Sequence, residues 1–128
     1  MKKDIKSIDD IKILVDSFYN SVQHDILIGG IFLGAIKDWP KHLNKMYTFW
    51  QTILLEEITY NGSPFPPHAN MPIDASHFNR WLELWKKTID DNFEGEVAEE
   101  AKWRAEKMAQ VFLFKIEYFR KNDAKPLI

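Results

Sequence analysis

The sequence predicts an all-α fold, and three observations support this prediction. Apolar residues recur three and four positions apart in four long segments, which is the spacing of one buried helix face. No segment shows the alternation of apolar and polar residues that is typical of a strand. Four of the six prolines fall within residues 60–72, a stretch that therefore cannot be a long helix and must separate two helical segments. The length suits one domain, over residues 1–128.

The first long helix is expected from about Ser7 to about His24. Ser7 can cap it, and Asp10, three residues later, can bond back and interact favourably with the helix dipole. Tyr19 lies at the edge of the apolar face, so its ring can pack while its hydroxyl seeks a partner. Residues 25–37 predict a turn and a short helix. That short helix would hold Ile31, Phe32 and Leu33, in a segment interrupted by Gly29, Gly30 and Gly34.

Asp38 and Pro40 predict a second long helix, because proline in a first turn has no helical backbone bond to lose. His42 lies on the apolar stripe of this helix, four residues before Met46 and seven before Phe49. His42 should therefore point inward or at the rim of a pocket. The stripe as a whole contains Trp39, Leu43, Met46, Phe49, Trp50, Ile53 and Leu54.

Two further helices follow the proline-rich stretch. Residues 74–77 should cap the first, which places Trp81 and Trp85 on its apolar face and His77 in an exposed first turn. The second is expected from about Glu96 to about Arg120. Small residues on its inner face allow close approach of another helix or a flat ligand. This inner face is expected to hold Ala98, Ala101, Ala105, Met108, Ala109, Phe112, Ile116 and Phe119.

Composition excludes several classes of function. The net charge is -2 and basic residues form no stripe, so a nucleic-acid partner is not expected. The absence of cysteine excludes disulfides, thiolate catalysis and iron–sulfur clusters. No apolar run approaches the roughly 18 residues of a membrane span, and no secretory signal follows Met1, so we expect no membrane contact and a cytoplasmic location.

Four histidines remain as the main candidates for chemistry. His24 and His77 are expected on the surface at helix ends, whereas His42 and His68 are candidates for a pocket. A zinc site built from His42, His68 and His77 would match no zinc spacing pattern. A haem pocket needs one neutral imidazole, an apolar wrapping and a few polar donors on the other side. Tyr19, His42 and Trp81 could supply those donors, although an aromatic content of 14% also fits a plain aromatic core.

Several segments, taken in order, resemble the third group of bacterial truncated haemoglobins. They are Phe18-Tyr19, Gly30-Ile31-Phe32, Trp39-Pro40-Lys41-His42, Phe49-Trp50, Tyr60-Asn61-Gly62-Ser63-Pro64 leading to His68, and the run from His77 to Trp85. The resemblance covers nearly the whole chain. It implies a truncated globin with a two-over-two helical sandwich. Residues 38–60 would form the distal helix, and the proline-rich stretch would replace most of the proximal helix.

The resemblance also implies a role for individual residues. His68 matches the proximal ligand of the iron of haem b, and Phe32 matches a phenylalanine that packs on the haem. Tyr19, His42 and Trp81 match the distal residues that stabilise a bound ligand, and Met46 and Phe49 are expected beside the cofactor. Lys45 and Arg80 are candidate partners of the haem propionates. Glycine pairs flanking the distal helix, which accompany a long apolar tunnel in other groups, are not seen here, so ligands could enter past His42.

The function implied by this resemblance is binding of O2 and related diatomic ligands, with NO, CO or peroxide as further ligands. A distal side rich in donors should hold O2 tightly, which favours oxidative or nitrosative redox chemistry over bulk oxygen transport. Peroxidase-like turnover and nitric oxide dioxygenation both remain open, the latter with an external reductase. The alternative from the residues alone is a haem-free, all-α binding or interaction module with an aromatic core.

Overall fold

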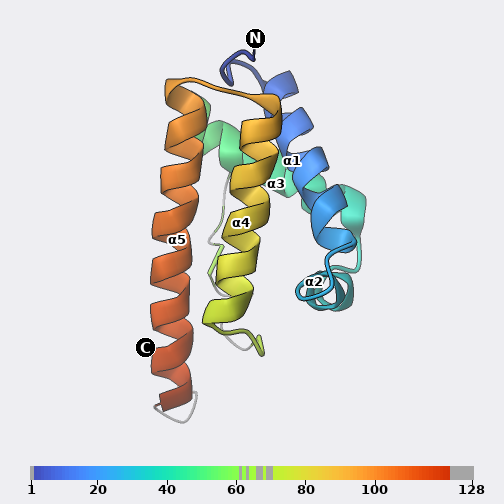
Figure 1. The fold of residues 1–128 in the computed structure, drawn as a ribbon, viewed down its shortest axis with the longest axis vertical. Helices are drawn as coiled ribbons and strands as arrows, with labels where there is room; N and C mark the ends of the chain where they lie inside the picture. Colours follow the sequence, from blue (N-terminus) through green and yellow to red (C-terminus); the bar gives the residue numbers. More distant parts are fainter. Residues whose placement is uncertain (1, 61, 63, 66–67, 69–70, 122–128) are drawn as a thin grey trace.

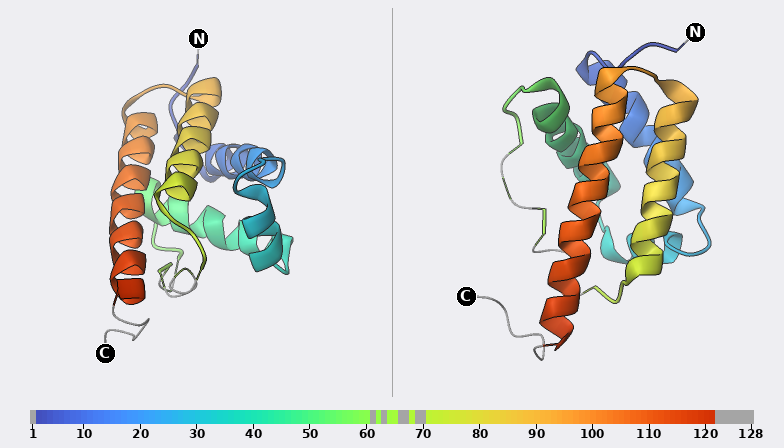
Figure 2. Two further views of the ribbon diagram at one scale, coloured as in Figure 1. Left: turned by 60° about the horizontal axis from the view of Figure 1, so that its bottom comes forward. Right: turned by 60° about the vertical axis from the view of Figure 1, so that its left-hand side comes forward.

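The structure, a computed structural model, describes residues 2–60, 62, 64–65, 68 and 71–121. Its helices, in chain order, are α1 (Ile8–Gln23), α2 (Gly29–Ala35), α3 (Trp39–Leu55), α4 (Ala75–Asn92) and α5 (Glu96–Lys121). α4 and α5 run antiparallel, side by side, and α1 and α3 form the second layer against them (Figures 1 and 2). The short α2 packs against α1. The all-α fold and the two-over-two arrangement are thereby confirmed.

Polar caps begin three of these helices where the sequence placed them. Ser7 Oγ accepts a hydrogen bond from the backbone N–H of Asp10 at 3.4 Å, and Asp38 caps α3 in the same way. Asp74 caps α4. The carboxylate of Asp10 is buried and accepts from the backbone N–H of Lys6 at 2.9 Å. Burial tends to raise the pKa of Asp10, but the side chain of Lys3 and the backbone N–H groups of Lys6 and Ser7 lower it, so Asp10 bonds back towards Ser7 as expected.

The α3 helix ends at Leu55, five residues before the end that the family resemblance implied. Glu56 adopts the left-handed conformation, with φ 58° and ψ 26°, which stops the helix. Thr52 Oγ1 then accepts hydrogen bonds from the backbone N–H groups of Thr59, at 3.1 Å, and Tyr60, at 2.9 Å. The segment after α3 is therefore folded back along the end of that helix, and a distal helix over residues 38–60 was too long a prediction.

The N-terminal segment caps the longest helix. Asp4 accepts hydrogen bonds from the backbone N–H groups of Val97, at 3.0 Å, and Ala98, at 2.9 Å, which are free donors in the first turn of α5. Gly95 precedes this turn with φ +136°, a conformation that favours glycine, and a Cβ there would lie 2.5 Å from the Asp4 carboxyl. The start of α5 thus depends on a residue near the other end of the chain.

The small residues of α5 allow α4 to approach closely. Ala101 and Ala105 are fully buried, and Trp85 of α4 lies against them with 1% of its surface exposed. The indole Nε1 of Trp85 donates to the carbonyl of Ala101 at 3.1 Å, so its polar group is satisfied within the core. The same indole stacks on Trp50 of α3, with ring centroids 4.5 Å apart. An aromatic core therefore joins the two layers.

Candidate functional site

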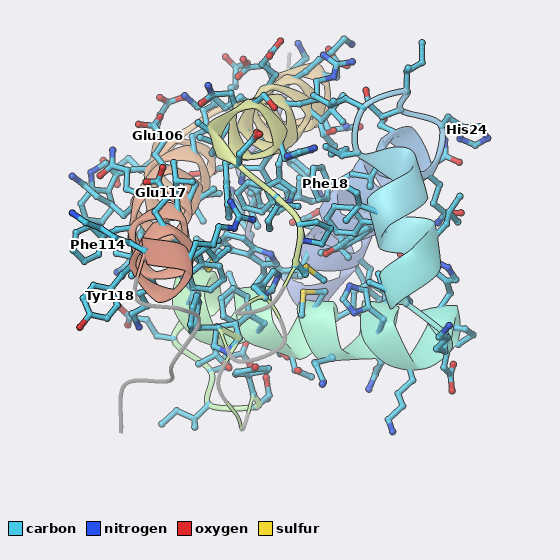
Figure 3. The ribbon with its side chains drawn as sticks, turned by 90° about the horizontal axis from the view of Figure 1, so that it is seen from below. Phe18, His24, Glu106, Phe114, Glu117 and Tyr118 are labelled. Atoms are coloured by element: carbon cyan, nitrogen blue, oxygen red, sulfur yellow. The ribbon has the colours of Figure 1, made fainter. Side chains whose placement is uncertain are left out.

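A cavity of about 270 Å³ lies between the two layers. This is close to the lower limit of typical small-molecule pockets, which is roughly 300 Å³. The structure brings all the residues predicted for the site to this one cavity. They are Tyr19, Phe32, His42, Met46, Phe49, His68 and Trp81. Phe18 also lines it and points into the interior from α1 (Figure 3). All five helices and the segment between α3 and α4 contribute residues to the lining.

His68 is held in a defined orientation. Its ring nitrogen Nδ1 lies 2.7 Å from the carbonyl oxygen of Pro64, which can only accept a hydrogen bond. Nδ1 must therefore carry the proton, and Nε2 keeps a free lone pair. Burial lowers the pKa of His68, although its bonds to the backbone oppose this, so the neutral ring is favoured. The ring of Phe112 packs beside it, 5.1 Å between centroids. A neutral, oriented imidazole of this kind is suited to bind a metal.

His42 presents an unsatisfied polar atom. Its Nε2 is buried and has no hydrogen-bond partner among the described residues. Burial lowers the pKa of His42, and the positive charge of Lys45, together with that of His68 whenever it is protonated, lowers it further. The ring is thus neutral near pH 7, with one nitrogen unused. Unpaired buried polar atoms are uncommon in folded proteins, so this one indicates a binding partner in the cavity.

Tyr19 supplies a phenol to the same cavity. Only 7% of its surface is exposed, and burial raises its pKa well above the ordinary value, so the hydroxyl stays protonated. The ring contacts Phe32 and Trp39 edge-on, at centroid distances of 5.9 and 5.8 Å. Packed on two sides, Tyr19 has little freedom to turn away from the cavity.

Trp81 reaches the cavity from α4. Its ring meets Phe18 edge-on at 5.9 Å and lies parallel to Trp85 of the next turn, at 6.2 Å. The helical spacing of Trp81 and Trp85 places both rings on the apolar face of α4, but only Trp81 lines the cavity. The aromatic core behind it therefore fixes its position.

His77 lies differently from its expected position. It was predicted to be exposed, but only 20% of its side chain is accessible and it lines the cavity. Its Nδ1 accepts a hydrogen bond from the backbone N–H of Asp74 at 2.9 Å, completing a capping box that turns the ring inward. His24 is exposed as expected, with Nδ1 2.8 Å from the carbonyl of Asn20. The described residues include no group of three potential metal ligands, so they do not support the zinc site considered for His42, His68 and His77.

Among the described residues that line the cavity, one carries a charged side chain. Lys45 lines it, and no carboxylate does so among the described residues. Arg80 is absent from the lining: its Nε donates to Asp25 at 2.7 Å and ties the start of α4 to the turn after α1. Of the two residues proposed as partners for an anionic group, only Lys45 therefore lies at this cavity.

Sequence reasoning missed several lining residues. Tyr60 and Met71 come from the segment between α3 and α4, and Phe78 lies one turn before Trp81. Met108 and Phe112 were expected on the inner face of α5 but not at the pocket. Phe78 had a usable signal, because it lies three residues before Trp81 on the same helix face. Met71 had none, since its place depends on a loop whose path a local pattern does not specify.

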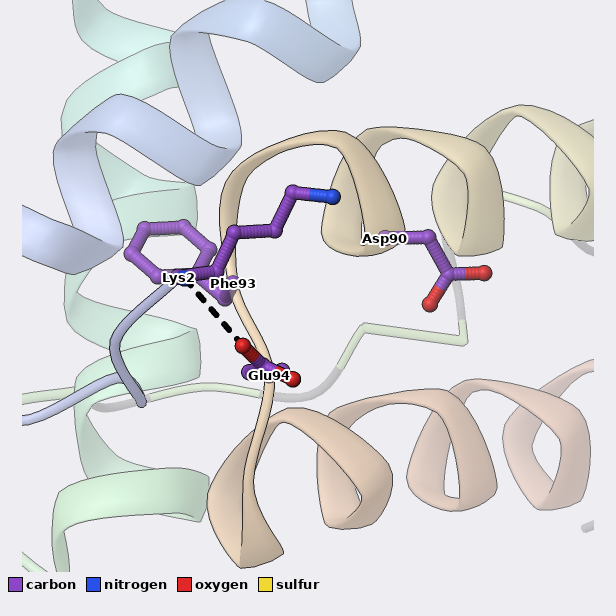
Figure 4. A pocket seen from close by; sticks show the side chains of 4 residues that line it. All are labelled: Lys2, Asp90, Phe93 and Glu94. Carbon is purple, nitrogen blue, oxygen red and sulfur yellow. Dashed lines mark hydrogen bonds between the residues drawn. The ribbon is translucent and has the colours of Figure 1, made fainter.

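A second hollow, of about 400 Å³, lies on the surface where the N-terminal segment meets the α4–α5 turn (Figure 4). It is lined by Lys2, Asp90, Phe93 and Glu94, and the backbone N–H of Lys2 donates to Glu94 at 3.1 Å. The hollow is open, and neither a histidine nor an aromatic cluster faces it. The cavity between the two layers, which His42, His68 and His77 line, is the better candidate. No helix in the described part of the chain has the length and apolar character to cross a membrane.

Comparison with known proteins gives concordant results. A model of the bacterial-like globin family matches residues 5–114. The group 3 truncated hemoglobin ctb of Campylobacter jejuni is 31% identical over 117 residues, covering 88% of this chain and 92% of that protein. The crystal structure of a group III truncated hemoglobin from Campylobacter jejuni superimposes with a TM-score of 0.83, at 30% identity, over 91% of this chain and 95% of that one.

Proposed function

Because this chain belongs to the bacterial-like globin family, and within it to the group III truncated haemoglobins, we propose that its cavity binds haem with His68 as the axial ligand of the iron. The observation that carries the proposal is the hydrogen bond from His68 Nδ1 to the carbonyl of Pro64, which leaves Nε2 with a free lone pair. The chain has no cysteine for a thioether link, so the cofactor would be haem b, held without covalent attachment.

The residues present fit such a group. Apolar and aromatic side chains form most of the lining, as a porphyrin ring requires. Phe32, Met46 and Phe49 would contact the ring, and the positive charge of Lys45, which lines the cavity, is suited to pair with a propionate. Bound haem would supply the iron that binds a diatomic ligand and exchanges electrons. The side chains of this protein would hold the haem and hydrogen-bond the ligand.

Tyr19, His42 and Trp81 would act on the opposite side of the cavity from His68. The Tyr19 hydroxyl stays protonated because burial raises its pKa, so it is a donor throughout the physiological range. His42, neutral and with Nε2 unpaired, can orient that hydroxyl or hydrogen-bond a ligand itself. Trp81 offers an indole N–H, which can only donate. These groups would bind O2 and the related ligands NO, CO and peroxide.

We propose redox chemistry with these ligands as the role, in preference to bulk oxygen transport. Several fixed donors stabilise a ligand that gains negative charge, and such stabilisation slows its release. Slow release is unsuited to delivery of oxygen, whereas it gives time for reaction with nitric oxide or for reduction. Steady turnover of this kind would draw electrons from an external reductase.

A haem titration tests the binding proposal. Haem-supplied protein should develop a Soret band with one equivalent of haem, and His68→Ala should shift the band and weaken haem retention. His24→Ala, which removes an exposed imidazole, is the matched control and should behave as the wild type. The haem-free binding module would be the correct description if no stoichiometric band forms. A band that His68→Ala leaves unchanged would reject His68 as the ligand.

The redox role needs a separate measurement. Stopped-flow mixing of the ferrous, oxygenated protein with nitric oxide should give nitrate and the ferric protein within the mixing time or shortly after it. The parallel reaction with peroxide distinguishes a peroxidase-like activity. Rapid dissociation of O2, without reaction in either experiment, would favour transport instead.

A further inference from the structure

His77, in the first turn of α4, brings a hydrogen-bond donor to the cavity. The backbone N–H of Asp74 donates to its Nδ1 at 2.9 Å, and a backbone N–H can only donate. Nδ1 therefore supplies a lone pair, and the proton of the neutral ring is on Nε2. Nε2 has no hydrogen-bond partner among the described residues. His77 is thus the reverse of His68, whose proton is on Nδ1.

The carboxylate of Asp74 does not change this assignment. Its Oδ1 lies 3.1 Å from the Nδ1 of His77 and already accepts from the backbone N–H and the hydroxyl of Ser76. If the imidazole takes up a second proton, that proton goes to Nδ1 and pairs with Asp74, while Nε2 keeps its own. Nε2 is a donor in both protonation states of the ring, so its role does not depend on titration.

The position of His77 is at the rim of the cavity. Its side chain is 20% accessible, whereas Tyr19 is buried deeper inside. Asp74 and Ser76, which precede His77 in the sequence, are both exposed, so this part of α4 is where the cavity meets solvent. Lys45 of α3 is also exposed and lines the same cavity. The rim therefore has a donor on each of two helices.

A flat ligand with an apolar ring and two carboxylates matches this distribution. The ring favours the apolar interior, whereas carboxylates are costly to bury and stay at the rim if donors meet them there. Lys45 can serve one carboxylate. Arg80 is not available for the other because it pairs with Asp25 and does not line the cavity. His77 is the remaining rim residue with an unused N–H, among those described.

We propose that His77 binds the cofactor directly, with its Nε2–H donating to a propionate of haem. This role rests on the proposed function, because it concerns the same cavity and the same ligand. A hydrogen bond to an ionised carboxylate is stronger than one between neutral groups. The capping box fixes the imidazole before the ligand arrives, so little side-chain freedom is lost on binding.

Two substitutions of His77 keep the helix start and change the donor. Glutamine and glutamate are the usual third residues of a capping box, so His77→Gln and His77→Glu should both preserve the start of α4. The first keeps an N–H donor, whereas the second places a negative charge at the rim. Asn79→Glu is the matched control, because it adds the same charge at an exposed position of α4 outside the lining. Urea unfolding of the haem-free variants checks that they are folded.

Porphyrins with and without free carboxylates measure the contact. Iron-free protoporphyrin IX carries both propionates, and its dimethyl ester carries neither charge. In a fluorescence titration, His77→Glu should raise the Kd of protoporphyrin IX about tenfold or more, because a like charge replaces a donor to the carboxylate. The same variant should bind the dimethyl ester within about threefold of the wild type, since no charge is repelled. His77→Gln and Asn79→Glu should bind protoporphyrin IX nearly as the wild type does.

The outcomes separate this role from the proposed function. Equal weakening of both porphyrins in His77→Glu, or an equal effect of Asn79→Glu, would overturn the contact between His77 and a propionate. Because protoporphyrin IX has no iron, the titration does not depend on His68 as the axial ligand. A wild type that binds both porphyrins, with no discrimination at His77, leaves the proposed function standing. A wild type that binds neither porphyrin overturns both.

The tautomer of His77 can be read in the wild type without any variant. A long-range proton–nitrogen NMR spectrum of the haem-free protein at about pH 8.5, where free imidazole is neutral, should show the proton of His77 on Nε2 and that of His68 on Nδ1. Protoporphyrin IX should shift the Nε2 resonance of His77 more than its dimethyl ester does. A proton on Nδ1 of His77, or equal shifts with the two porphyrins, would overturn the proposal.

Discussion

The rings of Tyr19 and His42 meet edge to face in the cavity, with centroids 5.2 Å apart and planes at 85°. The two residues come from different helices of the same layer, α1 and α3. Each carries a polar atom into a mainly apolar site, and burial favours the neutral form of each. Mutation of this pair tests the hydrogen-bonding role of the site most directly.

Tyr19→Phe should accelerate dissociation of O2 by about tenfold or more, because loss of one hydrogen bond to a charged ligand removes roughly 1.5–3 kcal/mol. The measurement is stopped-flow displacement of O2 by CO. Tyr47→Phe is the matched control, since the Tyr47 hydroxyl donates to Asp16 and lies outside the cavity. Equal dissociation rates in the two variants would show that Tyr19 is not the main donor.

Thr52→Val should loosen the segment that leads to His68. It removes the hydroxyl that accepts from the backbone N–H groups of Thr59 and Tyr60, and the net contribution of such a hydrogen bond is about 0.5–1.5 kcal/mol. We expect faster loss of haem to an acceptor protein and a smaller free energy of unfolding. Thr52→Ser keeps the hydroxyl and should restore both quantities. Identical haem loss in the valine and serine variants would argue against this role.

Trp85→Ala should reduce the free energy of unfolding by about 3–5 kcal/mol, the usual effect of removing a large aromatic side chain from a core. Trp85 is 1% exposed, stacks on Trp50 and bonds the carbonyl of Ala101. Trp103→Ala removes the same side chain from the surface and should change stability by less than about 1 kcal/mol in dilute solution. Denaturant unfolding followed by circular dichroism compares the two.

Asp4 should make stability dependent on acid pH. Burial tends to raise the pKa of Asp4, but the N–H groups of Val97, Ala98 and Ile5 outweigh it, so the pKa is lowered. The folded state therefore favours the carboxylate: its stabilisation is present above the ordinary pKa of 3.8 and is lost as pH falls below it.

Asp4→Ala should accordingly cost about 0.5–2 kcal/mol at pH 7, the range for loss of a helix cap. The difference from the wild type should shrink as the pH is lowered from 5 towards 2. Urea unfolding at a series of pH values measures it, and Lys2→Ala, two residues away and exposed, is the comparison. A difference that stays constant across this range would exclude the ionised cap as its cause.

Local signals predicted the helix starts well because the responsible residues bond within their own turn. Ser7, Asp38 and Asp74 each cap a helix by accepting a hydrogen bond from a backbone N–H two or three residues later. The end of α3 was missed because Glu56 carries no local signal for the left-handed conformation that stops the helix. Thr52, four residues before Glu56, supplies the acceptors that fold the chain back, and this involves contacts seven and eight residues apart.

The family resemblance predicted, residue by residue, the histidines, aromatic residues and tyrosine that the sequence analysis assigned to the candidate site. The structure adds what pattern alone does not contain. His77 turns inward because its ring completes a capping box, although its position in the first turn suggested exposure. Arg80 donates a hydrogen bond to Asp25. The two residues are 55 positions apart, and no periodic pattern in the sequence indicates this contact.

The Asp4 cap has a consequence for synthesis of the chain. Its two hydrogen bonds join residues 93 and 94 positions apart, so Asp4 leaves the ribosome long before its partners exist. Contacts of this separation form late, because the whole intervening loop must close first. The same helix supplies Met108 and Phe112 to the cavity wall, so a nascent chain that ends before α5 can neither close its fold nor enclose a ligand. Completion of the pocket must therefore wait until α5 has been synthesised.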